Sequence, residues 1–184
     1  MTEDAARIVT GRSCEGCAMC CYLLEVEALE KPAARWCAHC AGKRACAIYP
    51  DRPQECRDFH CGWLTTEALD ERWFPAKARL FLASEHDGMR LTCVVDPARP
   101  DAWRKDPYYG LLKGAAKQAA RFDGQVCVKV GRRWWVVLPD EDVALGEVGE
   151  DEVIVTEIGT GEDGSRRLKA MTLPRGDPRA KGMA

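Results

Sequence analysis

The distribution of apolar residues divides the chain near residue 62. Before that point the large apolar side chains are few and show no regular period. After it, segments of alternating apolar and polar residues are separated by turn signals, a pattern typical of half-buried β-strands. The pattern predicts an α+β chain in which a cysteine-rich module, residues 1–62, packs on a mostly antiparallel sheet with one amphipathic helix, residues 63–184.

The second part contains clear strand and helix signals. Gly131-Arg132 is a two-residue hairpin signal with glycine at its first position. Apolar residues recur at helical spacing over 107–122, which predicts an amphipathic helix ending near Phe122. A Gly-rich loop is expected at 159–164, and the tail after Pro174 is expected to fray. The predicted strands are 77–84, 89–95, 125–130, 133–138, 152–158 and 165–173.

The first part is marked by its cysteines. The chain has eleven, and nine of them fall within one stretch: Cys14, Cys17, Cys20, Cys21, Cys37, Cys40, Cys46, Cys56 and Cys61. Bound metal, redox-paired or free thiols, and structural disulfides would each explain such density. Disulfides need an export signal and usually an even count, whereas this chain begins with charged residues and the cluster is odd. We therefore predict thiolate-bound metal in a cytoplasmic protein. Cys93 and Cys127 lie in strand-like segments and are expected to be buried as small apolar residues.

The low apolar content of residues 14–62 gives a second reason to expect metal. A segment of this size buries too little apolar surface to offset its own chain entropy. Structural zinc contributes on the order of 10–16 kcal/mol in isolated zinc fingers. Bound metal is therefore expected to stabilise the fold of this module.

The spacing of the cysteines suggests how they bind. In Cys14-x-x-Cys17-x-x-Cys20-Cys21, a helix would place Cys14, Cys17 and Cys21 on one face, with Cys20 turned away by about 100° from Cys21. A second motif, Cys37-Ala-His39-Cys40, precedes the remaining thiols. Nine thiols exceed the four that one zinc ion uses, so more than one ion or a polynuclear centre is expected.

The identity of the metal stays open at this level. Zinc (Zn²⁺) is favoured because all-thiolate tetrahedral sites need no assembly machinery. Cys14, Cys17 and Cys20 also match the first three ligands of a bacterial ferredoxin run, so iron or an iron–sulfur cluster is the alternative. The match stops there, because no cysteine follows three residues later. His39 and His60 are possible imidazole ligands that the abundance of thiols makes unnecessary.

These motifs resemble a known family. The Cys14–Cys21 motif, followed by Cys46-Ala-Ile-Tyr-Pro-Asp-Arg52-Pro-Gln-Glu-Cys56-Arg57-Asp-Phe-His-Cys61, is similar to the CxxCxxCC cysteine-cluster family, also called the YkgJ-like zinc- or iron-chelating domain. The resemblance covers about a quarter of the chain and implies metal chelation. Arg52 and Arg57 flank Cys56 and are expected to hydrogen-bond the sulfurs or to offset the negative charge of a thiolate site.

Charge and motif content narrow the function further. The net charge of −2 and the pI near 6.0 give no reason to expect nucleic acid or an anionic membrane as partner. No apolar run is long enough for a membrane-spanning helix. No Ser-His-Asp or phosphate-binding motif is present. A metal-binding protein with a structural or metal-handling role is predicted, and the alternative is an iron–sulfur redox protein or accessory subunit. An enzyme is disfavoured, since a saturated thiolate shell leaves no open position for substrate.

Overall fold

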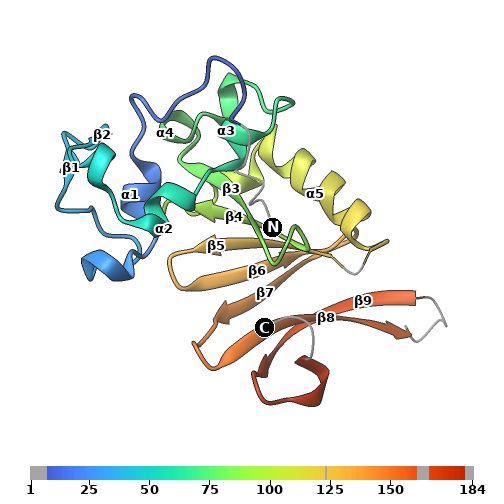
Figure 1. The fold of residues 1–184 in the computed structure, drawn as a ribbon. Helices are drawn as coiled ribbons and strands as arrows, with labels where there is room; N and C mark the ends of the chain where they lie inside the picture. The colour runs from blue at the N-terminus through green and yellow to red at the C-terminus, as the bar shows by residue number, and fades with distance from the viewer. Residues whose placement is uncertain (1–7, 123, 161–165, 181–184) are drawn as a thin grey trace, which may run out of the picture. The chain divides into compact units, whose positions relative to one another are not determined.

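The computed structural model describes residues 8–122, 124–160 and 166–180 (Figure 1). The described residues form a mixed α+β fold with a mostly antiparallel arrangement of strands. Its helices are α1 (Met19–Leu23), α2 (Gln54–Asp58), α3 (Gly62–Thr65), α4 (Pro75–Ala78) and α5 (Tyr108–Ala119). Its strands are β1 (Cys40–Ala41), β2 (Ala45–Cys46), β3 (Leu80–Glu85), β4 (Arg90–Val95), β5 (Gln125–Val130), β6 (Arg133–Val137), β7 (Asp142–Glu147), β8 (Glu152–Thr160) and β9 (Arg166–Pro174).

The strands are arranged in three sheets. One sheet has the order β3-β4-β5-β6-β7, and the pairs β1-β2 and β8-β9 form a two-stranded sheet each. The pairings β1-β2, β5-β6, β6-β7 and β8-β9 are antiparallel. In the described part of the chain no helix has both the length and the apolarity that a membrane crossing requires.

The chain divides into two compact units. The first comprises Met1–Ala83 and Cys93–Tyr108, and the second comprises Ser84–Thr92 and Tyr109–Ala184. Strands β3 and β4 therefore each contribute residues to both units, whereas the sequence pattern indicated a boundary near residue 62. All nine clustered cysteines belong to the first unit.

The first unit has a core beneath the cysteine-rich segment. Met19 and Leu23 lie one helical turn apart on α1 and are buried with Phe81, Ala83 and Val94. Partly buried side chains pack against this group, among them Cys17, Tyr22, Leu24, Phe59 and Cys61. The core thus holds α1 and the entry to α3 against β3 and β4, which fixes the backbone of two cysteine motifs.

Arg12 secures the chain just before the first cysteine. Its guanidinium donates hydrogen bonds to the carbonyl oxygens of Trp63, Thr66, Glu67 and Leu69. It also lies over the ring of Trp63, 5.1 Å from the centroid. These carbonyls belong to α3 and the turn after it, so Arg12 ties the Cys14 segment to the helix that follows Cys61.

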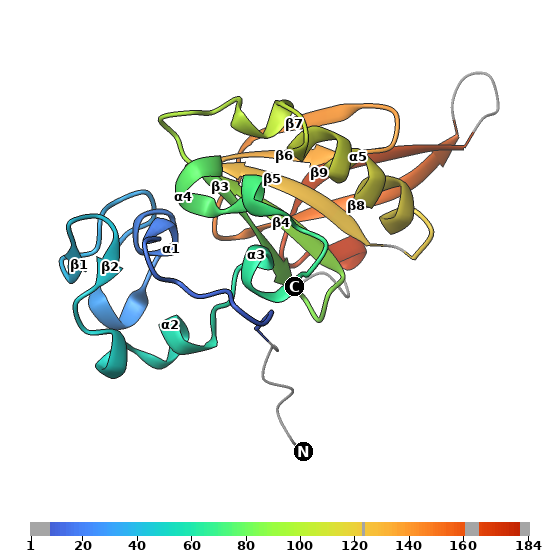
Figure 2. The same ribbon diagram turned by 90° about the horizontal axis from the view of Figure 1, so that it is seen from above.

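The second unit is built on hairpins and α5. Cys127, Val136, Leu138 and Ile154 form a buried cluster against which Trp134 packs. Helix α5 lies beside β5 and β6 (Figure 2), and its Lys113 Nζ donates to the carbonyl of Leu138 at 2.7 Å. The unit buries its apolar surface without the clustered cysteines.

Most predicted elements of the second part are confirmed. The hairpin turn at Gly131-Arg132 and the paired strands β8 and β9 form, and the helix predicted over 107–122 forms as α5 over Tyr108–Ala119. The first strand begins at Leu80, because Pro75 starts the short helix α4 at residues where a strand was expected. Strand β7 was not predicted, and Phe122 lies beyond the helix with 72% of its surface exposed.

Three expectations concerned local segments. The helical arrangement considered for Cys14, Cys17 and Cys21 does not occur, because α1 begins only at Met19 and a turn precedes it. Strand β8 extends to Thr160, and most of the Gly-rich loop lies outside the described residues. The tail was expected to fray, but Pro178–Ala180 form a 3₁₀ turn in which Ala180 is 2% exposed; residues 181–184 lie outside the description.

Candidate functional site

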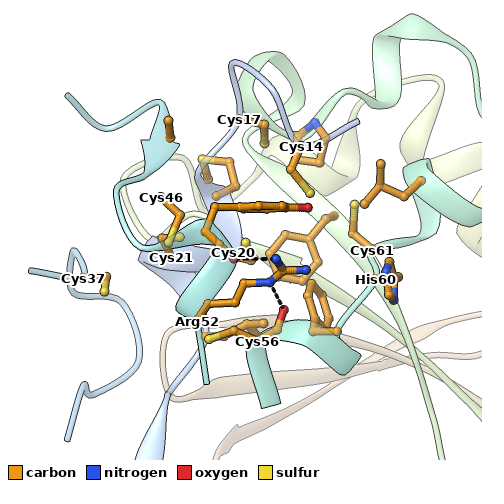
Figure 3. A pocket seen from close by; sticks show the side chains of 18 of the residues that line it. Cys14, Cys17, Cys20, Cys21, Cys37, Cys46, Arg52, Cys56, His60 and Cys61 are labelled. Atoms are coloured by element: carbon orange, nitrogen blue, oxygen red, sulfur yellow. Dashed lines mark hydrogen bonds between the residues drawn. The ribbon is translucent and has the colours of Figure 1, made fainter. Parts of the chain in front are cut away.

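A single pocket in the first unit gathers most of the clustered thiols. Its volume is about 460 Å³. Eight cysteines line it (Figure 3): Cys14, Cys17, Cys20, Cys21, Cys37, Cys46, Cys56 and Cys61. The ninth, Cys40, pairs with Cys46 in the β1-β2 hairpin. All eleven cysteines of the chain are free thiols, and the nine clustered ones are half-buried whereas Cys93 and Cys127 have no exposed surface. The expected burial of Cys93 and Cys127 is therefore confirmed.

The first motif is positioned by a turn and a short helix. The backbone N–H of Cys17 donates to the carbonyl of Cys14 at 3.0 Å, and Gly16 between them has a φ of +73°. Glycine adopts this left-handed conformation without steric cost. Cys20 and Cys21 follow on α1, whose buried Met19 and Leu23 set its rotation.

The second motif is positioned by a turn and a hairpin. The N–H of Cys40 donates to the carbonyl of Cys37 at 3.0 Å, and the N–H of Cys37 donates to the carbonyl of Cys21 at 3.0 Å. Cys40 and Cys46 are direct cross-strand partners, so their side chains lie on the same face of the hairpin. In both ribbon views the hairpin lies next to α1 (Figures 1 and 2).

The last two cysteines lie at the ends of short helices. Cys56 lies on α2, which is tied to the preceding segment because the Glu55 carboxylate accepts from the N–H of Ala28 at 2.9 Å. Cys61 is the residue that precedes α3, and its carbonyl accepts from the N–H of Leu64 at 2.9 Å. Both thiols therefore line the pocket although they lie far along the chain from the first motif.

Burial and mutual contact shift the acidity of the thiols. Burial raises the pKa of Cys17 to about 11 and also raises the pKa of Cys61. A hydrogen bond with Cys21, followed by burial, raises the pKa of Cys20. The same hydrogen bond lowers the pKa of Cys21 to about 7, because the Cys20 thiol donates to its sulfur. A cluster of this kind holds most of its protons until a cation offsets the charge of the thiolates.

Two cations lie near the sulfurs. Burial raises the pKa of Cys14, and the positive charge of Arg52 opposes that rise. Burial lowers the pKa of Lys31, and the negative charges of Cys37, Cys21 and Cys20 oppose that fall. Lys31 is 6% exposed, and its ammonium donates to the carbonyls of Tyr22, Leu24 and Pro32. Sequence reasoning missed Lys31, because nothing in the residues around it signals that its side chain will be buried against the carbonyls of Tyr22, Leu24 and Pro32.

The two arginines expected near the thiolates make contacts of a different kind. Arg52 donates to the carbonyls of Cys56 at 3.2 Å and Tyr49 at 2.7 Å, and it stacks over the Tyr49 ring at 3.8 Å. Arg57 donates to the carbonyls of Arg52 at 2.9 Å and Pro50 at 2.6 Å. These hydrogen bonds go to backbone oxygens and hold the turn before Cys56. Arg52 also places its charge near Cys14.

The thiol side chains suit a metal that prefers sulfur ligands. They do not, however, lie close enough together to form a complete coordination shell. Thiolates select zinc, copper(I) and iron–sulfur centres over hard cations such as magnesium and calcium. Across residues 8–122, 124–160 and 166–180, no three cysteine, histidine, aspartate or glutamate side chains converge closely enough to hold an ion. His60 lines the pocket and His39 is exposed, so neither completes such a group.

Known proteins offer no further guide to this site. Comparison with protein families, with curated proteins and with solved structures finds no match for this chain.

Proposed function

We propose that this protein binds sulfur-seeking metal ions through its clustered cysteines, in a structural or metal-handling role. The observation that carries the proposal is that eight free thiols, from six separate segments, line one pocket of about 460 Å³. In a reducing compartment, clustered thiols bind metal more often than they form disulfides. The resemblance to the CxxCxxCC cysteine-cluster family points to the same class of function.

The surroundings of the pocket support a metal-binding role. Apolar side chains such as Met19, Phe59 and Phe81 line it together with the thiols. A poorly hydrated wall strengthens the attraction between a thiolate and a divalent cation. Arg52 and Lys31 add fixed positive charge, which offsets part of the negative charge of an all-thiolate site.

Zinc is the ion we propose first, and an iron–sulfur centre is the second candidate. Structural zinc takes four tetrahedral ligands, which can all be thiolates, and it does not change oxidation state. The Cys14-x-x-Cys17-x-x-Cys20 run favours the second candidate, since iron–sulfur clusters use this spacing. With iron–sulfur chemistry the protein would serve as a redox protein or as an accessory subunit of an enzyme. We propose the cytoplasm as its location.

Elemental analysis of anaerobically purified protein tests this proposal. We expect bound zinc or iron in at least stoichiometric amount, and an absorption spectrum that separates colourless zinc from coloured iron–sulfur protein. The matched control is Cys127→Ala, which removes a buried thiol of the second unit and is expected to keep the metal content unchanged. Metal-free protein whose nine clustered thiols are all readily alkylated would refute the proposal.

A further inference from the structure

Two of the clustered cysteines face each other across the β1-β2 hairpin. Cys40 on β1 and Cys46 on β2 are direct partners in the antiparallel register, and Ala41 opposes Ala45 in the next pair. Both alanines are exposed, whereas both cysteines are half-buried. Because successive side chains of a strand point to opposite faces, the two thiols project side by side from the inner face of the hairpin.

The hydrogen bonds of the hairpin set the spacing of this pair. The N–H of Ala47 donates to the carbonyl of His39 at 2.8 Å, and these two residues flank the cysteines in the same register. Hydrogen-bonded and non-hydrogen-bonded pairs alternate in an antiparallel ladder, so Cys40 and Cys46 form a non-hydrogen-bonded pair, whose Cα atoms lie about 4.5 Å apart. A disulfide spans Cα separations of about 4.4 to 6.8 Å. The backbone of the hairpin therefore holds the two thiols within reach of a covalent bond.

The hairpin is open to small reactants and free to adjust. Its turn residues Gly42, Lys43 and Arg44 are exposed. Cross-strand Cβ atoms lie about 4.5 to 5.5 Å apart, whereas those of a disulfide lie about 3.5 to 4.5 Å apart. Two short exposed strands can approach each other by this amount. A disulfide that is exposed and held away from its preferred geometry is readily reduced, so the bond is expected to be reversible.

The two thiols differ in their relation to the pocket. Cys46 is one of the eight cysteines that line it, whereas Cys40 does not belong to the lining among the described residues. A bond between them would therefore remove one thiol from the pocket wall. It would give the ninth clustered cysteine a role that does not require it to reach the pocket.

We propose that Cys40 and Cys46 form a reversible cross-strand disulfide when the metal-free protein meets a low-molecular-weight disulfide, and that this bond lowers the capacity of the pocket for metal. The second statement rests on the proposed function, and the first does not. One protein thiolate attacks the small disulfide RSSR, forming a mixed disulfide and releasing one thiol RSH. The other protein thiolate then displaces the second RSH. The two cysteine sulfurs are oxidised, RSSR is reduced to two RSH, and the two cysteine protons end on the released thiols.

Two other pairs of clustered cysteines are close along the backbone. The N–H of Cys17 donates to the carbonyl of Cys14, and the N–H of Cys40 donates to the carbonyl of Cys37, at 3.0 Å each. Each of these contacts closes a turn, in which no strand register sets the direction of the two side chains. The register places Cys40 and Cys46 on one face. Their disulfide is therefore expected to form before either of the other two.

Peptide mapping of metal-free protein titrated with oxidised glutathione tests the disulfide. Trypsin cleaves after Lys43 and Arg44, so only a disulfide can keep peptides 36–43 and 45–57 together. Cys37 and Cys56 lie on the same peptides, so the linkage is assigned by fragmentation in the wild type and repeated in Cys37→Ser/Cys56→Ser, where we expect it to persist. In the matched control Cys40→Ser we expect no linkage and a glutathione adduct on Cys46, because the second thiolate is missing.

The effect on the pocket is measured by zinc titration of the wild type before and after this oxidation. We expect the oxidised protein to hold less zinc than the reduced protein, and a reductant to restore the difference. A first disulfide between Cys37 and Cys40 or between Cys14 and Cys17, or no disulfide at all, would overturn the pairing. Equal zinc binding by reduced and Cys40–Cys46-linked protein would overturn the redox control. A reduced protein that binds no metal would instead refute the proposed function and leave the mapped disulfide standing.

Discussion

Asp96 is a fully buried acidic residue of the first unit. Its side chain has no exposed surface, and it is paired with the guanidinium of Arg79, whose Nε donates to its Oδ2 at 2.8 Å. Its other oxygen accepts from the N–H of Ala98 at 2.9 Å, and its own N–H donates to the carbonyl of Arg79. The pair therefore fixes the turn after β4 to the residue before β3.

Loss of the Arg79 cation should destabilise the protein strongly. In Arg79→Met the Asp96 carboxylate would remain buried without a charged partner, and we expect unfolding free energy to fall by about 3 kcal/mol. Urea denaturation measures this change. The matched control is Arg72→Met, which breaks an ion pair with Asp70 at 2.5 Å whose partners are both well exposed. We expect little change there, since exposed pairs contribute little. Equal effects in the two variants would contradict the argument.

At the residue scale, the sequence predicted which cysteines would lie together better than it predicted the surroundings of each side chain. The nine clustered cysteines were identified by density, and eight of them line one pocket. The buried Cys93 and Cys127 were recognised because they lie among apolar strand residues. Lys31 was not recognised, because lysines are almost always exposed and the fold that buries this side chain leaves no signal in the sequence. The hydrogen bonds that Arg57 donates to the carbonyls of Arg52 and Pro50 hold a turn, a role that the sequence cannot distinguish from contact with sulfur.

At the scale of single elements, the β5-β6 hairpin depends on one glycine. The two-residue turn places Gly131 at a φ of +60°, and Val130 pairs with Arg133 on either side of it. We expect Gly131→Ala to lower the unfolding free energy by about 1 kcal/mol, because an L side chain is strained in this conformation.

Gly114 is the matched control of opposite sign. It lies on the exposed side of α5, and a Cβ added there meets nothing within 4 Å. Gly114→Ala should raise the unfolding free energy by up to about 1 kcal/mol, through better helix propensity. Urea denaturation of both variants checks the pair, and stabilisation by Gly131→Ala would show that the turn conformation is not as described.

Elements with strong local signals were predicted, and those defined by tertiary packing were not. The α5 helix and the hairpins β5-β6 and β8-β9 have regular periods and turn residues at the right places. Strand β7 has a glycine at a φ of +78° and a register shift opposite Trp134 and Trp135, which interrupt its alternation. Helices α1 to α4 have five residues or fewer, too short to show a helical period in sequence.

For the whole molecule, apolar burial is distributed unequally between the cysteine-rich segment and the rest. Among residues 8–62, the buried apolar residues are Ala18, Met19, Leu23 and Val26. The hairpin β5-β6 alone buries Val126, Cys127, Val128, Val130, Val136 and Val137. Local stability follows buried apolar contacts, so the two regions should respond differently when metal is removed.

Chelation should therefore loosen the cysteine-rich segment selectively. Bound zinc supplies folding free energy where apolar burial is small, so its removal should increase amide hydrogen exchange in residues 14–61 by at least about tenfold. Exchange in β5, β6, β8 and β9 should change by less than about twofold, because hydrogen-bonded strands and their buried side chains hold these elements together. Hydrogen exchange with mass spectrometry compares the two regions in one sample.

A chelator already saturated with zinc serves as the control in this experiment, since it has the same chemistry but removes no metal. With it, we expect exchange in residues 14–61 to stay as slow as in untreated protein. Uniform acceleration over both regions would show that metal stabilises the chain as one cooperative body. Unchanged exchange in residues 14–61 would show that Met19, Leu23 and the Arg12 contacts hold this segment without metal, and that the pocket is already formed before any ion binds.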